Sequence, residues 1–162
     1  MADLYCIDSS SVIQLARYLP QSVLGPLWEL LDTLADEKRL LAPREVLREV
    51  SKRDDLALAW ARDHKSIFVD LDAEQGAMVR KLQTDYPVLN DPNRPLNADP
   101  WCLGLTLLKT QAGEPCHLVN EEKDTALASN KLPYLCRQLK LKSAKLLEVP
   151  GLEGLRFTLS KQ

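Results

Sequence analysis

Short apolar runs alternate along this chain with longer segments whose apolar residues recur at helical spacing. Five runs are too short for a helix and predict strands, at residues 4–7, 40–42, 67–71, 116–119 and 146–149. Helices are predicted between them, after residue 8, from 25, after 43, from 54, over 73–83, from 99 and over 132–141. Strands that alternate with helices predict an α/β fold, here a three-layer α/β/α sandwich with a central parallel sheet.

Two of these helices are expected to bury a defined face. The helix that opens at Asp54-Asp55 turns Leu56, Trp60 and Ala61 inward. In a later helix, Asp99 takes the N-cap and Pro100 the first helical position. Its predicted inner face consists of Trp101, Gly104, Leu105 and Leu108. The glycine in that face indicates close packing on the sheet.

The first predicted strand ends on Asp8, followed by three serines and a helix. In an open parallel sheet, ligands bind beyond the carboxyl ends of the strands, so Asp8 is presented to the functional crevice. The alternative is structural, with Asp8 or Ser9 capping the helix that follows. Both interpretations place this stretch at the start of a helix.

The length of 162 residues fits one domain with its own core, which we place at residues 1–150, and leaves 151–162 as a C-terminal tail. The formal net charge of −2 excludes a global basic footprint, so a nucleic-acid substrate requires a local basic rim. No run is long enough to span a membrane, and Asp3 stands where a signal peptide carries basic residues. We therefore expect a cytoplasmic protein without membrane contact.

The cysteine and histidine residues limit the kinds of catalytic and metal site that the chain can form. The four cysteines are far apart and form no C-x-x-C pair, so we expect buried, reduced thiols. The chain has only two histidines, His64 and His117, so few residues could serve as the base of a serine or cysteine hydrolase triad.

Acidic residues recur just beyond the carboxyl ends of the predicted strands. Asp8 follows the first strand, Glu45 and Glu49 lie on the helix after the second, and Asp99 opens the helix before the fourth. The fourth strand is followed by Asn120, Glu121, Glu122 and Asp124. Right-handed connections bring all these segments to one edge of a parallel sheet.

Three or four carboxylates that converge in this way cannot all be ionised cheaply without a cation between them. The pattern therefore predicts a site for Mg²⁺ or Mn²⁺, which prefer oxygen ligands. Such ions support metal-assisted hydrolysis of a phosphodiester. Taken singly, each acid has a simpler explanation, because the helix dipole favours acids at helix starts.

Glu45 and Glu49 lie one turn apart on the same helical face, so both could point to the crevice. Glu45 sits in the first turn, where the dipole favours an acid whatever the function. Glu49 has no such local explanation. We therefore predict Glu49 as the ligand and Glu45 as a supporting residue.

Residues 87–98 form a loop rich in proline and asparagine, which we expect to rim the site. Basic residues accompany it. The predicted substrate-binding set is Arg44, Arg48, Lys52 and Arg53 on the helix after the second strand, with Arg94 on the loop. The alternative for this set is a solvated charged face.

Four short motifs, in this order and spacing, resemble the PIN domain, the nuclease fold of many toxin-antitoxin ribonucleases of the VapC type. They are Ile7-Asp8-Ser9-Ser10, Leu47-Arg48-Glu49-Val50, Ala98-Asp99-Pro100 and Val119-Asn120-Glu121-Glu122-Lys123-Asp124. The resemblance covers roughly residues 4 to 149. It implies a sheet with the first strand central, the second and third strands on one side, and the fourth and fifth on the other.

The resemblance also implies roles for individual residues. The catalytic and metal-binding acids are Asp8, Glu49, Asp99 and Glu122, with Asp124 as a further metal ligand and Ser9, Ser10 and Asn120 in support. Two positions depart from the family pattern, because many relatives have threonine or serine at Asn120 and aspartate at Glu122. The stretch 131–136 resembles a PIN-like branch of uncharacterised prokaryotic proteins.

We therefore expect a Mg²⁺- or Mn²⁺-dependent endoribonuclease that cuts single-stranded RNA. The resemblance further implies a toxin role with a cognate antitoxin protein as partner, and a homodimer. The alternative is a catalytically inactive PIN-like binding module, because the longer arm of Glu122 would shift the metal.

Two other classes fit less well. A receiver-like signalling domain would use Asp70 as phosphoacceptor, but it requires an acidic pair at Asp8, where serines follow. A phosphatase with two aspartates flanking one residue requires an aspartate where this chain has Ser10.

Overall fold

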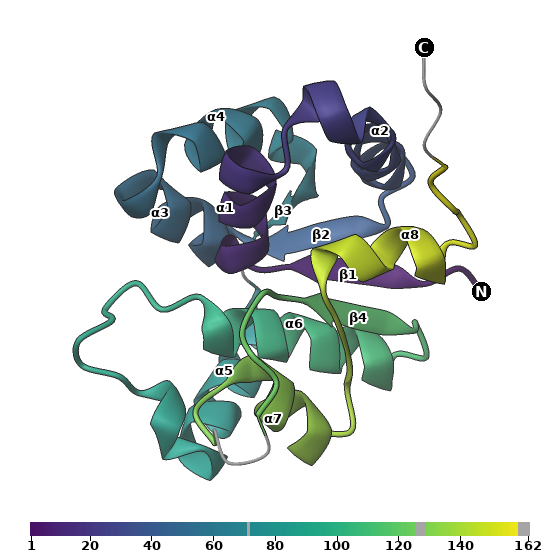
Figure 1. The fold of residues 1–162 in the computed structure, drawn as a ribbon. Coiled ribbons are helices and arrows are strands. Elements are labelled where there is room, and N and C mark those ends of the chain that lie inside the picture. The colour runs from purple at the N-terminus through teal and green to yellow at the C-terminus, as the bar shows by residue number, and fades with distance from the viewer. Residues whose placement is uncertain (71, 126–128, 159–162) are drawn as a thin grey trace.

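A parallel sheet runs through the centre of the molecule (Figure 1). The structure is a computed structural model that describes residues 1–70, 72–125 and 129–158. Within these residues the strand order is β3-β2-β1-β4-β5, and every pairing is parallel. The strands are β1 (Leu4–Ile7), β2 (Leu40–Pro43), β3 (Phe68–Val69), β4 (Cys116–Val119) and β5 (Lys142–Ala144). The predicted α/β fold and the central place of the first strand are confirmed.

Helices cover both faces of the sheet and complete a three-layer sandwich (Figure 1). One face carries α1 (Ser9–Tyr18), α2 (Gln21–Asp36), α3 (Arg44–Arg53) and α4 (Asp55–Asp63). The other face carries α5 (Ala73–Asp85), α6 (Asp99–Gln111) and α7 (Leu132–Gln138). A short helix, α8 (Val149–Leu152), and the 3-10 turns η1 (Lys65–Ile67), η2 (Pro87–Leu89) and η3 (Leu146–Glu148) complete the elements.

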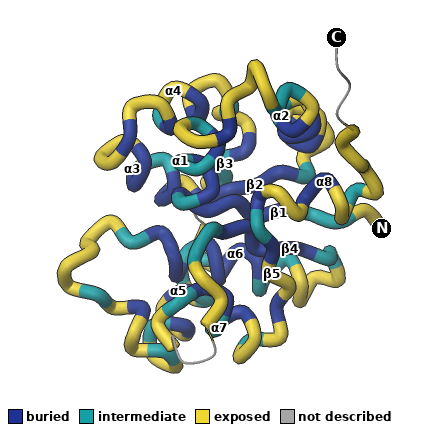
Figure 2. The backbone as a smooth tube through the Cα atoms, viewed as in Figure 1, coloured by how far each residue is buried: buried dark blue, intermediate teal, exposed yellow. Residues whose placement is uncertain are grey.

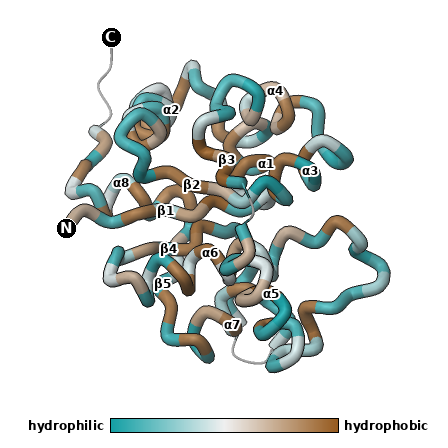
Figure 3. The backbone as a smooth tube through the Cα atoms, turned by 180° about the vertical axis from the view of Figure 1, so that it is seen from behind, coloured by the Kyte–Doolittle hydropathy of each residue, from teal (hydrophilic) through white to brown (hydrophobic). Residues whose placement is uncertain are grey.

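The central strand β1 is buried along most of its length (Figure 2). Tyr5, Cys6 and Ile7 have no exposed surface. The strand pairs with β2 on one side, where Cys6 faces Leu41, and with β4 along its whole length on the other. The adjacent strands β1, β2 and β4 are largely hydrophobic (Figure 3), as expected where both faces of a parallel sheet are covered. The residues that follow β1 are therefore anchored by a buried strand that has a neighbour on each side.

The last predicted strand, at residues 146–149, is wrong. The fifth strand is Lys142–Ala144, and the apolar residues after it form η3 and the start of α8. Leu146 and Val149 are buried while Leu147 is exposed. This three-residue spacing is helical and does not alternate as in a strand. As an edge strand that pairs with β4 alone, β5 tolerates a polar sequence. This polar sequence is the reason why the hydrophobic pattern did not predict it.

Several predicted boundaries and faces are corrected as well. The helix expected over 132–141 ends at Gln138, because Lys140 takes the left-handed φ of 56° that terminates it. The third strand is shorter than expected, since Ile67 belongs to η1, and Leu71 lies outside the described residues. In α4, Leu56 is exposed, although Trp60 and Ala61 are buried as predicted.

Helix α6 packs against α5 at Gly104. A Cβ atom at that position would stand 3.2 Å from Cγ2 of Val79 on α5, so the close approach is to a helix and not, as predicted, to the sheet. The buried face of α6 also differs, because Cys102 and Leu103 are buried whereas Trp101 and Leu108 are half-buried. The N-cap of α6 is Ala98, and Asp99 is its first residue.

The segment beyond residue 150 is tied to the sheet by Glu153. The Tyr5 hydroxyl donates to Glu153 Oε1 at 2.6 Å, and Arg39 Nη1 donates to Glu153 Oε2 at 2.9 Å. The segment 151–158, part of the predicted tail, is therefore attached to the packed body through Glu153. Residues 159–162 lie outside the described residues.

The four cysteines are buried and free, as predicted. In the described ranges, no helix combines the length and the apolar character that crossing a membrane requires.

Replacing Gly104 tests the contact between α5 and α6. Gly104→Leu should lower the free energy of unfolding by roughly 1–3 kcal/mol, because the larger side chain overlaps Val79 and Met78. Gly76→Leu on α5 is the matched control, since its nearest neighbour is the flexible end of Arg80. The control should be neutral or stabilising by up to about 1 kcal/mol. Urea denaturation of both variants measures these changes in the free energy of unfolding. Equal losses of stability in the two variants would contradict the close contact between α5 and α6.

A candidate active-site cleft

A cleft of about 570 Å³ opens at the carboxyl edge of the sheet, where β1, β2 and β4 end. Carboxylates from four separate segments line it, namely Asp8, Glu49, Asp99 and Glu122. Basic side chains also line it, namely Lys52, Arg53, Arg94 and Lys131. The remaining lining residues are Ser10, Asn93, Pro95, Leu96 and Asn97. The loop before α6 thus rims the cleft, as predicted.

Asp8 occupies the carboxyl end of β1 and caps α1 at the same time. Its Oδ1 accepts a hydrogen bond from the Ser11 amide at 2.9 Å, and the Ser10 hydroxyl donates to Oδ1 and Oδ2 at 2.8 and 2.9 Å. The residue is only 3% exposed. The structural and functional interpretations of Asp8 are therefore compatible, because one carboxylate caps a helix and lines the cleft.

Two of the cleft acids have raised pKa values. Burial raises the pKa of the Asp8 carboxyl to about 7, against the hydrogen bonds from Ser11 and Ser10, and the negative charges of Asp99 and Glu122 add to the rise. Burial likewise raises the pKa of Asp99 to about 6, with Arg94 acting in the opposite direction. Burial in the cleft therefore disfavours the ionised form of both carboxyls.

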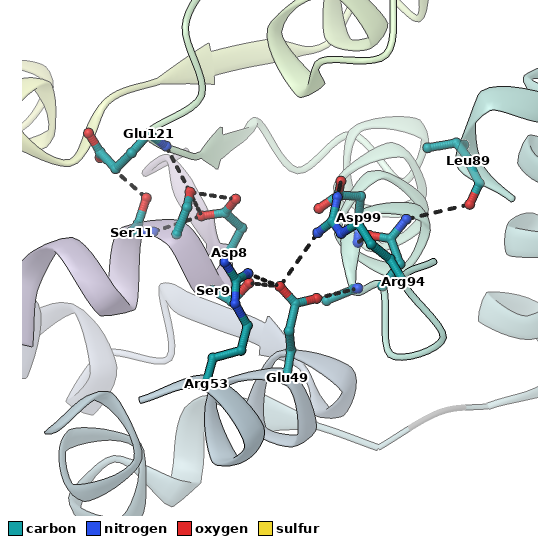
Figure 4. Close-up of polar contacts among 12 residues, drawn as sticks. Asp8, Ser9, Ser11, Glu49, Arg53, Leu89, Arg94, Asp99 and Glu121 are labelled. Carbon is teal, nitrogen blue, oxygen red and sulfur yellow. Dashed lines mark hydrogen bonds and ion pairs between the residues drawn. The ribbon is translucent and has the colours of Figure 1, made fainter. Parts of the chain in front are cut away.

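Glu49 joins three segments of the chain at the floor of the cleft (Figure 4). Its Oε1 accepts from the Ser9 hydroxyl at 2.6 Å and from Arg53 Nη1 at 2.8 Å. Its Oε2 accepts from the backbone amide of Ala98 at 2.9 Å. One buried carboxylate thus connects α3 with the start of α1 and with the residue before α6.

Glu45 does not line the cleft, although it is buried one turn before Glu49 on the same helix. Its Oε2 has no hydrogen-bond partner among the described residues, and its Oε1 lies 3.7 Å from Arg48 Nη1. Of the two glutamates that the sequence placed on one face, only Glu49 reaches the cleft.

Asp99 faces the cleft from the first turn of α6, paired with the loop that precedes it. Arg94 Nη1 lies 3.2 Å from Asp99 Oδ2, and Arg94 Nη2 lies 3.6 Å from Glu49 Oε1. The Asn97 side-chain oxygen accepts from the Asp99 amide at 3.1 Å. Figure 4 shows Arg94 and Asp99 together on one side of Glu49, with Asp8 on the other.

The acids after β4 separate into different roles. Glu122 lines the cleft, but its Oε2 accepts from the Leu132 amide at 2.6 Å and so caps the start of α7. Glu121 accepts from the Ser11 hydroxyl at 3.3 Å and from the Leu146 amide at 2.8 Å. Asp124 is exposed, pairs with Arg137 and does not line the cleft. The predicted metal ligands Glu122 and Asp124 are therefore not brought together.

Asn120 is completely buried behind the cleft. Its amide donates to the Ser143 hydroxyl at 3.1 Å, and its side-chain oxygen accepts from the Glu122 amide at 3.2 Å. Asn120 therefore supports the turn that carries Glu122.

The predicted substrate-binding residues divide in two. Lys52, Arg53 and Arg94 line the cleft, whereas Arg44 pairs with Asp70, and Arg48 lies toward Glu45. Lys131, Asn93 and Asn97 also line the cleft, although none of them was among the predicted site residues. The asparagines lie in the loop that was expected to rim the site, and Lys131 directly precedes a predicted helix. Their positions in the sequence could therefore have identified them, although their residue types did not.

The side chains are not arranged as a formed metal centre. Over residues 1–70, 72–125 and 129–158, no group of three or more His, Cys, Asp or Glu side chains is placed to hold a metal ion. The donor chemistry nevertheless fits a hard cation, because the cleft offers only carboxylate, hydroxyl and amide oxygens. Asp8, Asp99 and Glu49 are the acids that could hold such an ion.

Comparison with known proteins identifies a family. A family model described as "Domain of unknown function (DUF4411)" matches residues 5–157. The chain belongs to this family. The matched range of the DUF4411 model begins within β1 and extends past Glu153, so it includes every residue that lines the cleft. A search among curated proteins found no match to the chain.

The raised pKa of Asp8 predicts how stability depends on pH when no metal is present. An unfolded aspartate titrates near pH 4, so between about pH 4 and 7 the folded protein binds more protons than the unfolded chain. The free energy of unfolding should therefore fall as the pH rises through this window. Asp8→Asn cannot ionise and keeps a capping side chain, so it should be more stable than wild type at pH 8, by roughly 2–4 kcal/mol.

Chemical denaturation in EDTA at pH 5 and pH 8 provides the measurement. Asp124→Asn is the control, since Asp124 is exposed and lies outside the cleft, and it should follow the wild type at both pH values. If Asp8→Asn were less stable than wild type at pH 8, the claim that burial of the ionised Asp8 carboxylate destabilises the fold would be wrong.

Proposed function

We propose that this protein is a PIN-like endoribonuclease that hydrolyses single-stranded RNA with Mg²⁺ or Mn²⁺. The observation that carries the proposal is the convergence of Asp8, Glu49, Asp99 and Glu122 in one cleft, from four segments that are distant in sequence. Lys52, Arg53, Arg94 and Lys131 line the same cleft. Carboxylates suited to hold a cation, next to positively charged side chains that attract phosphate, suit metal-assisted hydrolysis of a phosphodiester.

Three acids would hold the ion, and their own contacts keep them in position. The Ser10 hydroxyl and Ser11 amide hold the Asp8 carboxylate, and the Ser9 hydroxyl and Ala98 amide hold Glu49. Such contacts orient the groups that bind a metal. When bound, Mg²⁺ or Mn²⁺ supplies the ionisation of a water and the neutralisation of phosphate charge.

The basic side chains give the cleft its preference for an anionic strand. Arg53 and Arg94 contact the acids and are also partly exposed, at 55% and 40%, so their guanidinium groups can reach phosphates at the rim. Lys52 from α3 and Lys131 from the start of α7 flank the same opening. An overall charge of −2 means that attraction of an anionic strand depends on local groups of basic residues such as this one.

A catalytically inactive binding module is the second candidate. The observation in its favour is that Arg94 and Arg53 neutralise Glu49 and Asp99, while the carboxylate of Glu122 is used to cap α7. Such a protein would bind RNA through the same basic residues without cutting it. A toxin role, a cognate antitoxin partner and a homodimer follow from the resemblance to the PIN domain alone.

Two glutamates on one helix test the assignment of the catalytic acids. Glu49→Gln should reduce Mn²⁺-dependent cleavage of a labelled single-stranded RNA by more than the roughly 10- to 100-fold that loss of an outer-shell partner costs. Glu45→Gln removes the same charge one turn away, outside the cleft, and should retain nearly full activity. Circular dichroism must match for both variants.

EDTA should abolish cleavage by the wild-type protein. RNA that is bound with micromolar affinity but never cut, in Mn²⁺ and in Mg²⁺, would reject the nuclease and support the binding module. Cleavage that Glu45→Gln abolishes and Glu49→Gln spares would move the second acid to Glu45.

Metal binding should also be visible in the stability of the protein. Because an ion that binds only the folded chain shifts the unfolding equilibrium, Mn²⁺ at a hundredfold excess over its Kd should stabilise the fold by about 2.7 kcal/mol. Asp8→Asn removes a ligand and should show a smaller shift in melting temperature. A wild-type melting curve indifferent to millimolar Mn²⁺ at pH 8 would contradict the proposal.

A further inference from the structure

Arg94 lies between two of the acids that the proposed metal needs. Its Nη1 is 3.2 Å from Asp99 Oδ2, and its Nη2 is 3.6 Å from Glu49 Oε1. Both carboxylates are largely buried, whereas the arginine side chain is 40% exposed. The guanidinium therefore supplies positive charge to the place where the carboxylates of α3 and α6 approach each other (Figure 4).

The other cations at the cleft do not occupy this place. Arg53 contacts Glu49 Oε1 from its own helix, four residues away, and no contact joins it to Asp99 in the described chain. Lys52 lines the cleft, and in the described chain it forms no ion pair with an acid. Arg94 alone among the described cations bridges two cleft acids.

The structure also offers Arg94 an alternative position. A second cavity of about 240 Å³ shares Arg94, Asn97 and Asp99 with the cleft and is otherwise lined in part by Asp91. Asp91 precedes Arg94 by three residues and brings a carboxylate to this second cavity, where its Oδ1 accepts a hydrogen bond from the Asn93 amide at 2.9 Å. The side chain therefore has room and a charged partner if it leaves Glu49 and Asp99.

We propose that Arg94 is an internal counter-ion that competes with the divalent cation for Glu49 and Asp99, so that metal binding displaces its guanidinium. This inference rests on the proposed function, because it concerns the same acids. The physical reason is that one carboxylate oxygen cannot both accept a close guanidinium contact and ligate a metal at full strength. The contacts of Arg94 must weaken before the ion is held.

Calorimetric titration of each metal-free protein with Mn²⁺ at about pH 8 tests the inference without any activity measurement. Arg94→Gln should bind Mn²⁺ roughly five- to tenfold more tightly than wild type, because two partly exposed ion pairs no longer compete. Arg94→Lys keeps the positive charge but cannot contact two carboxylates through a planar guanidinium. Its Kd for Mn²⁺ should therefore lie between those of wild type and Arg94→Gln.

Lys52→Gln is the matched control, since it removes one positive charge from the same cleft without removing a contact to an acid. Its Kd should stay within about twofold of the wild type. Equal tightening in Lys52→Gln and Arg94→Gln would overturn the inference in favour of a general charge effect. If Arg94→Gln fails to fold, Arg94→Lys carries the test in the same direction.

The outcomes distinguish the inference from the function on which it rests. Mn²⁺ binding of equal strength to wild type and Arg94→Gln would overturn the role of Arg94 and leave the metal site standing. Binding to Arg94→Gln alone would support the inference strongly. Absence of binding to every variant would reject the metal site itself, and the inference with it.

Discussion

The burial of negative charge at the carboxyl edge of the sheet is the constraint on which the rest of the site depends. Parallel connections deliver the ends of β1, β2 and β4 to one place, and acidic residues follow in each case. Burial raises the pKa values of Asp8 and Asp99, so the fold carries a cost at neutral pH that a cation can offset. Hydroxyls, backbone amides and arginines offset part of this cost within the chain.

Several cleft acids also hold the structure together. Asp8 caps α1, Glu49 fastens α3 to the residue before α6, and Glu122 caps α7. The carboxylates for which we propose a chemical role therefore also have a structural one. Because their substitution can change stability, each activity experiment needs a matched acid outside the cleft, such as Glu45 or Asp124.

Membership of the DUF4411 family extends the argument beyond one chain. The family match begins within β1 and extends past Glu153, so the tie between the C-terminal segment and the sheet lies inside the family domain. The proposed metal-dependent nuclease and the internal counter-ion at Arg94 together give this domain a chemistry that binding measurements can test. Under this proposal, a cation and the guanidinium of Arg94, which lies in the loop before α6, would compete for the same carboxylates.

The sequence alone determined the α/β class, the first four strands and the acids at their ends, because hydrophobic periodicity and polar strand ends are local properties. It did not reveal β5, whose two exposed positions carry no apolar signal. Only the tertiary structure decided that Glu49 reaches the cleft and Glu45 does not, and that Asp124 turns to Arg137. Equivalent positions on a helix face or loop differ only in what packs against them, and those neighbours come from segments distant in the sequence.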